Sequence, residues 1–179
     1  MAKRNNSHSR AGTAAASALA QPNSTPEQVC GELSGLFKVS LHEIAIYKLE
    51  KGLLKFLFPA ELKTAGTIPL SSSIAVSART ATAKKAELFN NFAKVKHASV
   101  FESVRGNQKE KKQSEQFSIQ KLISAPVLDR DGDVVGVIQI CRKGADLSCG
   151  PDFSLQDLKQ VELAAKALGE TAFMQTLDE

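Results

Sequence analysis

The sequence predicts an α+β domain with one sheet and helices at its face, and three observations carry that prediction. Apolar residues recur at helical spacing near both ends of the chain, over residues 25–38 and 154–174. Between them lies an alternating hairpin pattern, followed by two long apolar strands, 119–128 and 133–141. A chain of 179 residues with 42% hydrophobic content is long enough for one core and too short for two.

The first helix and the hairpin have clear local signals. Thr25 can cap a helix that has Pro26 at its first position and Gln28 three residues after the cap. Period-two patterns then predict strands over residues 42–49 and 53–58, joined by a tight turn. The apolar positions of the helix form one stripe: Val29, Leu33, Leu36 and Phe37.

The sequence in the middle of the chain predicts short strands and a short helix. A short strand is expected at 67–70, and the serines at 71–73 offer N-caps for a small-residue helix that runs to about Lys85. A brief strand is expected over 87–92. Residues 106–116 are almost entirely polar and charged, which is typical of a solvent loop.

The last third predicts two neighbouring strands and a helix. Asp129 to Gly132 is a turn sequence between the two apolar strands, with glycine where a positive φ is needed. Ser154 can cap the final helix, whose apolar positions continue to Ala172. We therefore expect a single domain over residues 25–177.

Composition limits the function classes. The formal net charge is +4, and Lys3, Arg4 and Arg10 all precede the first acid, so the remainder is nearly neutral. We expect no nucleic-acid binding by the core. No apolar stretch approaches the roughly 20 residues that span a bilayer, so we expect no membrane association.

The N-terminus and the cysteines point to the cytoplasm. Residues 1–24 are rich in Ser, Ala and Asn, and we expect a flexible tail there. The tail imitates a secretory signal but lacks its hydrophobic region. The cysteines match no zinc spacing and fit a reducing compartment: Cys30, Cys141 and Cys149. We expect no metal site, and the sequence leaves the cofactor unknown.

Four motifs together resemble a GAF domain over residues 26–174. They are T-I-P-L-S at 67–71, K-L-I-S-A-P at 121–126, D-G-D-V-V-G-V-I-Q at 131–139, and F-S-x-x-D-L at 153–158. The resemblance implies a profilin-like central antiparallel sheet of about five to six strands. It also implies that the N- and C-terminal helices lie on one face of the sheet and a ligand pocket on the other.

Part of a phosphodiesterase GAF signature, N-K…F-x-x-x-D-E, is present. Lys143, Phe153 and Asp157 match its K, F and D, whereas Arg142 and Leu158 replace its N and E. The resemblance implies a structural bridge between Lys143 and Asp157. Cyclic-nucleotide specificity is not expected. The alternative interpretation of Asp157 is a capping-box acid opposite the serine three residues before it.

If a pocket exists, the segment between the crossing helix and the charged loop should line it. Apolar walls with a few amides and an imidazole suit a small polar ligand. Alternatively, the asparagines make a turn, the phenylalanines fill core, and loop 105–116 is a solvated insertion instead of a lid. The candidate ligand-binding residues are Phe89, Asn90, Asn91, Phe92, His97 and Phe101.

The sequence therefore predicts a regulatory domain that senses a small molecule, and not an enzyme. No catalytic residue is assigned, because no nucleophile elbow, carboxylate pair or phosphate loop is present. We expect a homodimer through the terminal helices. One alternative is a ligand-free dimerisation or protein-interaction module. Another is a thiol enzyme like the free methionine sulfoxide reductases, which are GAF proteins, but residues 92–119 contain no cysteine.

Overall fold

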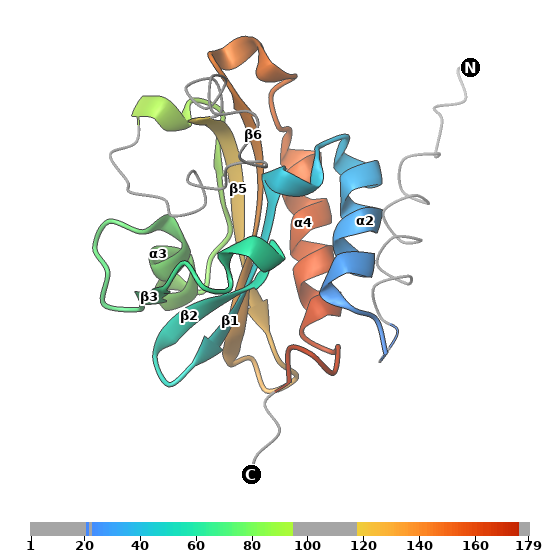
Figure 1. Ribbon diagram of the computed structural model, residues 1–179, viewed down its shortest axis with the longest axis vertical. Helices are drawn as coiled ribbons and strands as arrows, with labels where there is room; N and C mark the ends of the chain where they lie inside the picture. The colour runs from blue at the N-terminus through green and yellow to red at the C-terminus, as the bar shows by residue number, and fades with distance from the viewer. Residues whose placement is uncertain (1–20, 22, 95–117, 176–179) are drawn as a thin grey trace, which may run out of the picture.

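A computed structural model describes residue 21 and residues 23–94 and 118–175 of the chain (Figure 1). It contains one six-stranded sheet with the order β3-β2-β1-β6-β5-β4, and all neighbouring strands are antiparallel. This confirms the predicted α+β class. The strands are β1 (Ile44–Glu50), β2 (Leu53–Phe58), β3 (Thr67–Pro69), β4 (Glu87–Phe89), β5 (Ser118–Leu128) and β6 (Val134–Gly144).

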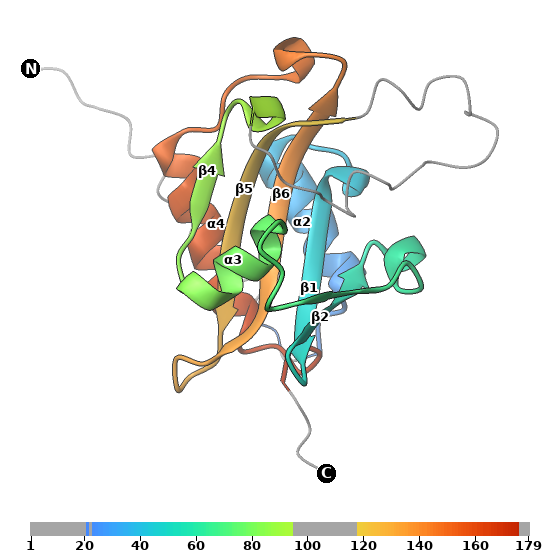
Figure 2. The same ribbon diagram turned by 90° about the vertical axis from the view of Figure 1, so that its left-hand side faces the viewer.

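Helices cover both faces of the sheet. Figure 1 shows α2 and α4 side by side on one face, and Figure 2 shows α3 lying across the other. Short 3-10 turns connect the larger elements. The helices are α2 (Pro26–Phe37), α3 (Val76–Ala83) and α4 (Leu155–Leu168), and the turns are η1 (Leu41–Glu43), η2 (Ala60–Leu62), η3 (Phe92–Lys94) and η7 (Leu147–Cys149).

The predicted hairpin of two long strands is confirmed as β5 and β6 next to the middle of the sheet. Ser124 lies opposite Gln139 in the register, and Ile123 lies opposite Ile140. Successive side chains alternate between the two faces. Residues such as Ile123 therefore join the core under α2 and α4, whereas the neighbouring Leu122 joins the core under α3.

Both terminal helices begin where the sequence predicts. Thr25 and Gln28 form a capping box at α2, and Ser154 and Asp157 form another at α4. The prediction that the last helix continues to Ala172 is wrong, because α4 ends at Leu168. The helix passes into a tighter turn, in which the amides of Glu170 and Thr171 donate to carbonyls three residues before them. A Cβ atom at Gly169 would collide with the carbonyl oxygen of Leu128 on β5, so this close approach requires glycine.

The helix on the other face is shorter than predicted. α3 begins at Val76, not within the serines at 71–73, and Ala75 is its N-cap without a side-chain hydrogen bond. Ser72 instead accepts from the Ala75 amide at 3.2 Å, which holds the preceding turn. Likewise, β4 stops at Phe89, and a 3-10 turn follows where the sequence predicted a strand to residue 92.

An irregularity in the sheet changes the face of one residue. The register between β1 and β2 shifts between Ile46 and Tyr47. As a result Phe58 joins the core under α2 and α4, whereas Phe56 joins the core under α3. In the described part of the chain, no helix is long and apolar enough to cross a membrane.

Candidate functional site

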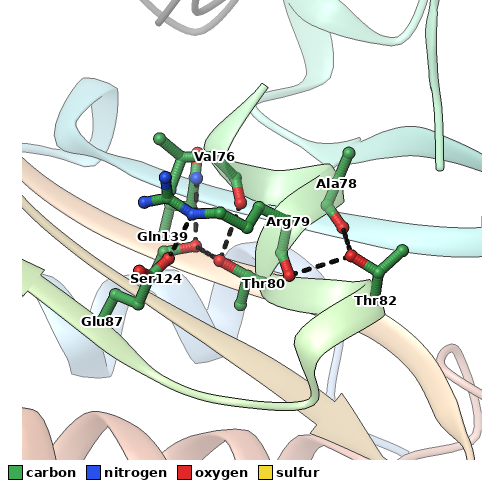
Figure 3. A network of polar contacts seen from close by, with 8 residues as sticks. All are labelled: Val76, Ala78, Arg79, Thr80, Thr82, Glu87, Ser124 and Gln139. Atoms are coloured by element: carbon green, nitrogen blue, oxygen red, sulfur yellow. Dashed lines mark hydrogen bonds and ion pairs between the residues drawn. The ribbon is translucent and has the colours of Figure 1, made fainter. Parts of the chain in front are cut away.

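A chain of hydrogen-bonded polar side chains crosses the middle of the sheet beneath α3. The Tyr47 hydroxyl on β1 donates to Gln139 Oε1 on β6 at 3.1 Å, and Gln139 Nε2 donates to Ser124 Oγ on β5 at 3.1 Å. Ser124 Oγ lies 2.7 Å from Thr80 Oγ1 on α3. Figure 3 shows how Thr80, Ser124 and Gln139 point toward one another between the helix and the sheet. We call these four residues the polar relay.

The direction of every hydrogen bond in the polar relay is fixed. Thr80 Oγ1 donates its hydrogen to the Val76 carbonyl oxygen at 2.8 Å within α3. A hydroxyl has one hydrogen, so Ser124 must be the donor toward Thr80. The relay therefore runs from β1 through β6 and β5 to a carbonyl of α3, with each member both oriented and satisfied.

All four members of the polar relay are buried, with no more than 2% of any of them exposed. A buried polar group without a partner costs about 1–3 kcal/mol, so the relay favours one position of α3 on the sheet. Burial, with a smaller contribution from nearby Cys141, raises the pKa of Tyr47 above its ordinary value. The phenol therefore stays neutral and keeps its hydrogen for Gln139.

An aromatic and charged wall flanks the polar relay on the β4 side. The rings of Phe89 and Phe92 meet edge to face with centroids 6.0 Å apart. The Arg79 guanidinium carbon lies 5.7 Å from the Phe89 centroid, and Arg79 Nε bonds Glu87 Oε2 at 3.0 Å. Figure 3 shows this Arg79–Glu87 pair beside the relay. The structure thus brings two of the predicted site residues, Phe89 and Phe92, to the α3 face.

The two asparagines of the predicted site have different positions. The side-chain amide of Asn90 makes two hydrogen bonds to the backbone of Phe153. Asn90 Nδ2 donates to the Phe153 carbonyl oxygen at 2.9 Å, and Asn90 Oδ1 accepts from the Phe153 amide nitrogen at 2.8 Å. Asn91 is half-buried, and its carbonyl accepts from the Lys94 amide at 3.3 Å. The predicted contacts of His97 and Phe101, and the loop 105–116, lie outside the described residues.

The predicted bridge between Lys143 and Asp157 stays a prediction. Asp157 Oδ2 accepts from the Ser154 amide at 2.6 Å and from its hydroxyl at 2.9 Å, as the capping-box interpretation expects. The backbone nitrogen of Lys143 donates to Glu43 Oε1 at 2.7 Å, which ties the end of β6 to η1.

The three cysteines are free thiols and form no disulfide. Cys30 is a buried residue of α2, Cys141 is buried on the α3 face, and Cys149 is half-buried in η7. Burial is the main cause that raises the pKa of both Cys30 and Cys149, so neither is an activated thiolate. Among the described residues, no cluster of three or more His, Cys, Asp or Glu side chains is placed to hold a metal.

Sequence reasoning did not select the polar relay. A usable signal was present, since Ser124 and Gln139 are buried polar residues with apolar neighbours in two largely buried strands. A polar side chain in a strand buried on both faces must find a partner. That requirement identifies the residues but not the partner.

The sheet order, the paired terminal helices and the crossing helix α3 define an α+β domain with the GAF fold. No family model and no curated protein matches the sequence. Solved structures do match. The GAF domain of an Acinetobacter phosphoenolpyruvate-protein phosphotransferase is similar with a TM-score of 0.66 at 13% identity, covering 93% of this chain and 92% of that one.

Two further structures show how widely this fold is shared. The GAF domain of a phosphoenolpyruvate-protein phosphotransferase from Coxiella burnetii has a TM-score of 0.64 at 8% identity and covers 92% of this chain and 93% of its own. The fRMsr of Staphylococcus aureus, in complex with substrate, has a TM-score of 0.56 at 16% identity, with coverages of 94% and 97%. The GAF fold read from the sequence motifs is therefore confirmed.

Proposed function

We propose that the protein is a regulatory signal-transduction domain that binds a small molecule over the α3 face of its sheet and catalyses no reaction. The observation that carries this proposal is the polar relay, which connects the covering helix α3 to three strands of a GAF fold. A ligand can shift a protein between two states only through different affinities for them. A ligand that exchanges hydrogen bonds between α3 and the sheet would have different affinities for the states with and without those bonds.

The polar relay is suited to exchange with a ligand. A net intramolecular hydrogen bond contributes about 0.5–1.5 kcal/mol, so a ligand hydroxyl or amide can replace Thr80 at Ser124 with little loss. The aromatic pair Phe89 and Phe92 then supplies an apolar wall beside the exchanged bond. The expected ligand is thus small, with apolar area and a few hydrogen-bonding groups.

A metabolite screen by thermal shift tests the proposal. A ligand at 100 times its Kd adds about 2.7 kcal/mol of stability. The stabilisation should be smaller in Ser124→Ala than in Thr82→Val, a matched variant in the same region whose hydroxyl bonds only within α3. If no class of metabolite raises the melting temperature of the wild-type chain, the sensing proposal fails.

A ligand-free interaction module is the second candidate, and one observation favours it. The α3 face is filled by the protein's own aromatic rings, since Phe92 is 2% exposed and the Tyr47 and Phe56 rings lie 4.4 Å apart. A screen without binders, combined with a stable dimer in solution, would select this candidate.

Under either candidate, we propose a homodimer through the outer surfaces of α2 and α4. Two leucines of α4 support this, because Leu155 is 74% exposed and Leu163 is 49% exposed. The exposed charges of α2 are the acids Glu27 and Glu32, whereas α4 exposes Lys159 and Lys166 together with Glu162. Leu163→Lys should shift sedimentation equilibrium toward monomer, whereas Ile74→Lys, at an exposed position on the other side of the sheet, should not.

A thiol enzyme is the third candidate, because the fRMsr of Staphylococcus aureus shares the fold. Replacing Cys141 and Cys149 by serine and assaying methionine sulfoxide reduction tests it. Reductase activity in the wild type that both variants lose would overturn the proposal of a non-enzymatic domain. The three cysteines are free thiols, which supports our proposal of a cytoplasmic location.

A further inference from the structure

Residues 150–153, which precede α4, form a segment held by side chains from across the sheet, and we call it the clasp segment. Lys121 on β5 has only 4% of its side chain exposed. Its Nζ donates to the Gly150 carbonyl oxygen at 2.6 Å and pairs with Asp152 Oδ1 at 2.8 Å. A buried ammonium is costly unless it is paired, so these contacts fix the clasp segment against β5.

The last residue of the clasp segment, Phe153, joins the two terminal helices. Its ring is buried in the core under α2 and α4, and the Arg142 guanidinium carbon lies 4.7 Å from its centroid. The same guanidinium donates to the carbonyls of Phe37 and Lys38 at 3.3 and 3.4 Å, where α2 ends. Ser154 caps α4 directly after Phe153. The contacts of Arg142 with Phe153 and with the last carbonyls of α2 therefore fix the end of α2 relative to the start of α4.

Asn90 connects the clasp segment to the α3 face. Its amide makes both hydrogen bonds to the backbone of Phe153, as a neighbouring strand would. The preceding residue, Phe89, points to the other face, where its ring meets Phe92 beside the polar relay. The adjacent residues Phe89 and Asn90 therefore place a ring on the α3 face of the sheet and a side-chain amide on the face covered by α2 and α4.

We propose that Asn90 and Arg142 are coupling residues that carry a displacement of residues 89–92 through Phe153 to the shared end of α2 and α4. The two-state element is the clasp segment, which is closed when Asn90 holds Phe153 and open when that pair of bonds is broken. The inference rests on the proposed sensing function and names its route from the site face to the helices.

Hydrogen exchange on the full, ligand-free chain tests the coupling. Asn90→Ala removes both bonds to Phe153 and should speed exchange about tenfold at the amides of Val39 and Leu158, which report the end of α2 and the start of α4. The neighbouring Asn91→Ala is the matched control and should leave both amides unchanged. Arg142→Met should speed the same two amides.

The double variant decides between coupling and independent effects. If Asn90 and Arg142 act through Phe153, the combined change in exchange free energy is smaller than the sum of the single changes. Additive effects, or faster exchange confined to residues 88–92, overturn the inference. If Asn90→Ala does not fold, Asn90→Asp retains the acceptor and sets two oxygens against each other, so it should speed the same amides.

Failure of the coupling is distinguishable from failure of the proposed function. The exchange experiment needs no ligand, whereas the metabolite screen does not depend on Asn90. A ligand that binds the wild type and the Asn90→Ala variant equally, but protects the Leu158 amide only in the wild type, supports both proposals. A binder that protects this amide equally in both proteins retains the sensing function and overturns the coupling.

Discussion

Ser124 and Gln139 lie opposite each other on adjacent central strands, and the Gln139 side-chain amide donates to the Ser124 hydroxyl at 3.1 Å. Ser124 in turn donates to Thr80 at 2.7 Å, so the pair fixes a helix as well as a strand register. A GAF sheet with a purely apolar surface under α3 would bind that helix by packing alone. Here the contact also requires a specific alignment of hydroxyls.

Replacing Thr80 by valine should destabilise the protein by about 1–3 kcal/mol, because the buried hydroxyl of Ser124 loses its acceptor. The change conserves shape and β-branching, so cavity effects are small. Chemical denaturation measures the free energy of unfolding.

Thr82→Val is the matched control for Thr80→Val. Thr82 is exposed, and its hydroxyl bonds only the Ala78 and Arg79 carbonyls of its own helix, so its loss should change stability by less than about 0.5 kcal/mol. Equal costs at the two positions would mean that the polar relay contributes nothing beyond local helix propensity.

The parts of the fold with local signals were predictable from sequence. Thr25, Pro26 and Gln28 start α2 through contacts within three residues, and the same holds for the Ser154 capping box. The start of α3 was not predictable in this way. Several serines offer caps there, but the helix begins at Val76, which packs in the core under α3, after an N-cap that makes no side-chain bond.

The candidate site was predictable only in part, because its bonds span the chain. Phe89 and Phe92 could be chosen from their place beside the crossing helix. The polar relay joins residues that are 92 positions apart, from Tyr47 to Gln139, and 44 apart, from Thr80 to Ser124. Asn90 shows the same limit, since its partner is 63 residues away and on the opposite face from its neighbouring ring.

The free energy of unfolding should decrease at acidic pH because Glu50 becomes protonated. Its hydrogen bond and ion pair with Lys55, at 2.6 Å, lower the pKa of this carboxylate. A carboxylate with a lowered folded-state pKa stabilises the protein above its unfolded-state pKa, about 4.3, and loses that contribution as the pH falls through the folded-state value. The pair is largely exposed, so its contribution is below about 1 kcal/mol.

Lys55→Met checks the acid effect. The variant should show a shallower loss of unfolding free energy between neutral pH and pH values below the Glu50 titration, measured by denaturation at several pH values. Lys63→Met, at another exposed lysine, should retain the wild-type slope. A wild-type slope in Lys55→Met would contradict the assigned cause.

Gly150→Ala should be more destabilising than its backbone conformation alone explains. Gly150 has φ +151°, and a Cβ atom there would lie 2.9 Å from Cδ of Arg142. Gly66 is the matched control, because it has φ +115° and open space around its Cβ position. Gly66→Ala therefore reports backbone strain, and the excess cost in Gly150→Ala reports displacement of Arg142. Removing the obstacle in Gly150→Ala/Arg142→Ala should lower that excess.

Replacing Gly31 of α2 and Gly169 at the end of α4 by alanine should change the stability of the protein in opposite directions. Gly31 lies on the exposed surface of α2 with open space around its Cβ position, so Gly31→Ala should stabilise by about 0.4–1 kcal/mol through helix propensity. Gly169 packs its Cα directly against the Leu128 carbonyl at the end of α4, so Gly169→Ala should destabilise by about 1–3 kcal/mol.

Thermal and chemical unfolding at low protein concentration determines whether each variant has a higher or lower free energy of unfolding than the wild type. A dilution series separates propensity from association, because Gly31 lies on the surface proposed for the dimer. If Gly31→Ala is stabilising only in dilute solution and loses that gain as concentration rises, the added methyl obstructs the partner helix. Stabilisation by Gly169→Ala would contradict the close approach of the end of α4 to Leu128 on β5.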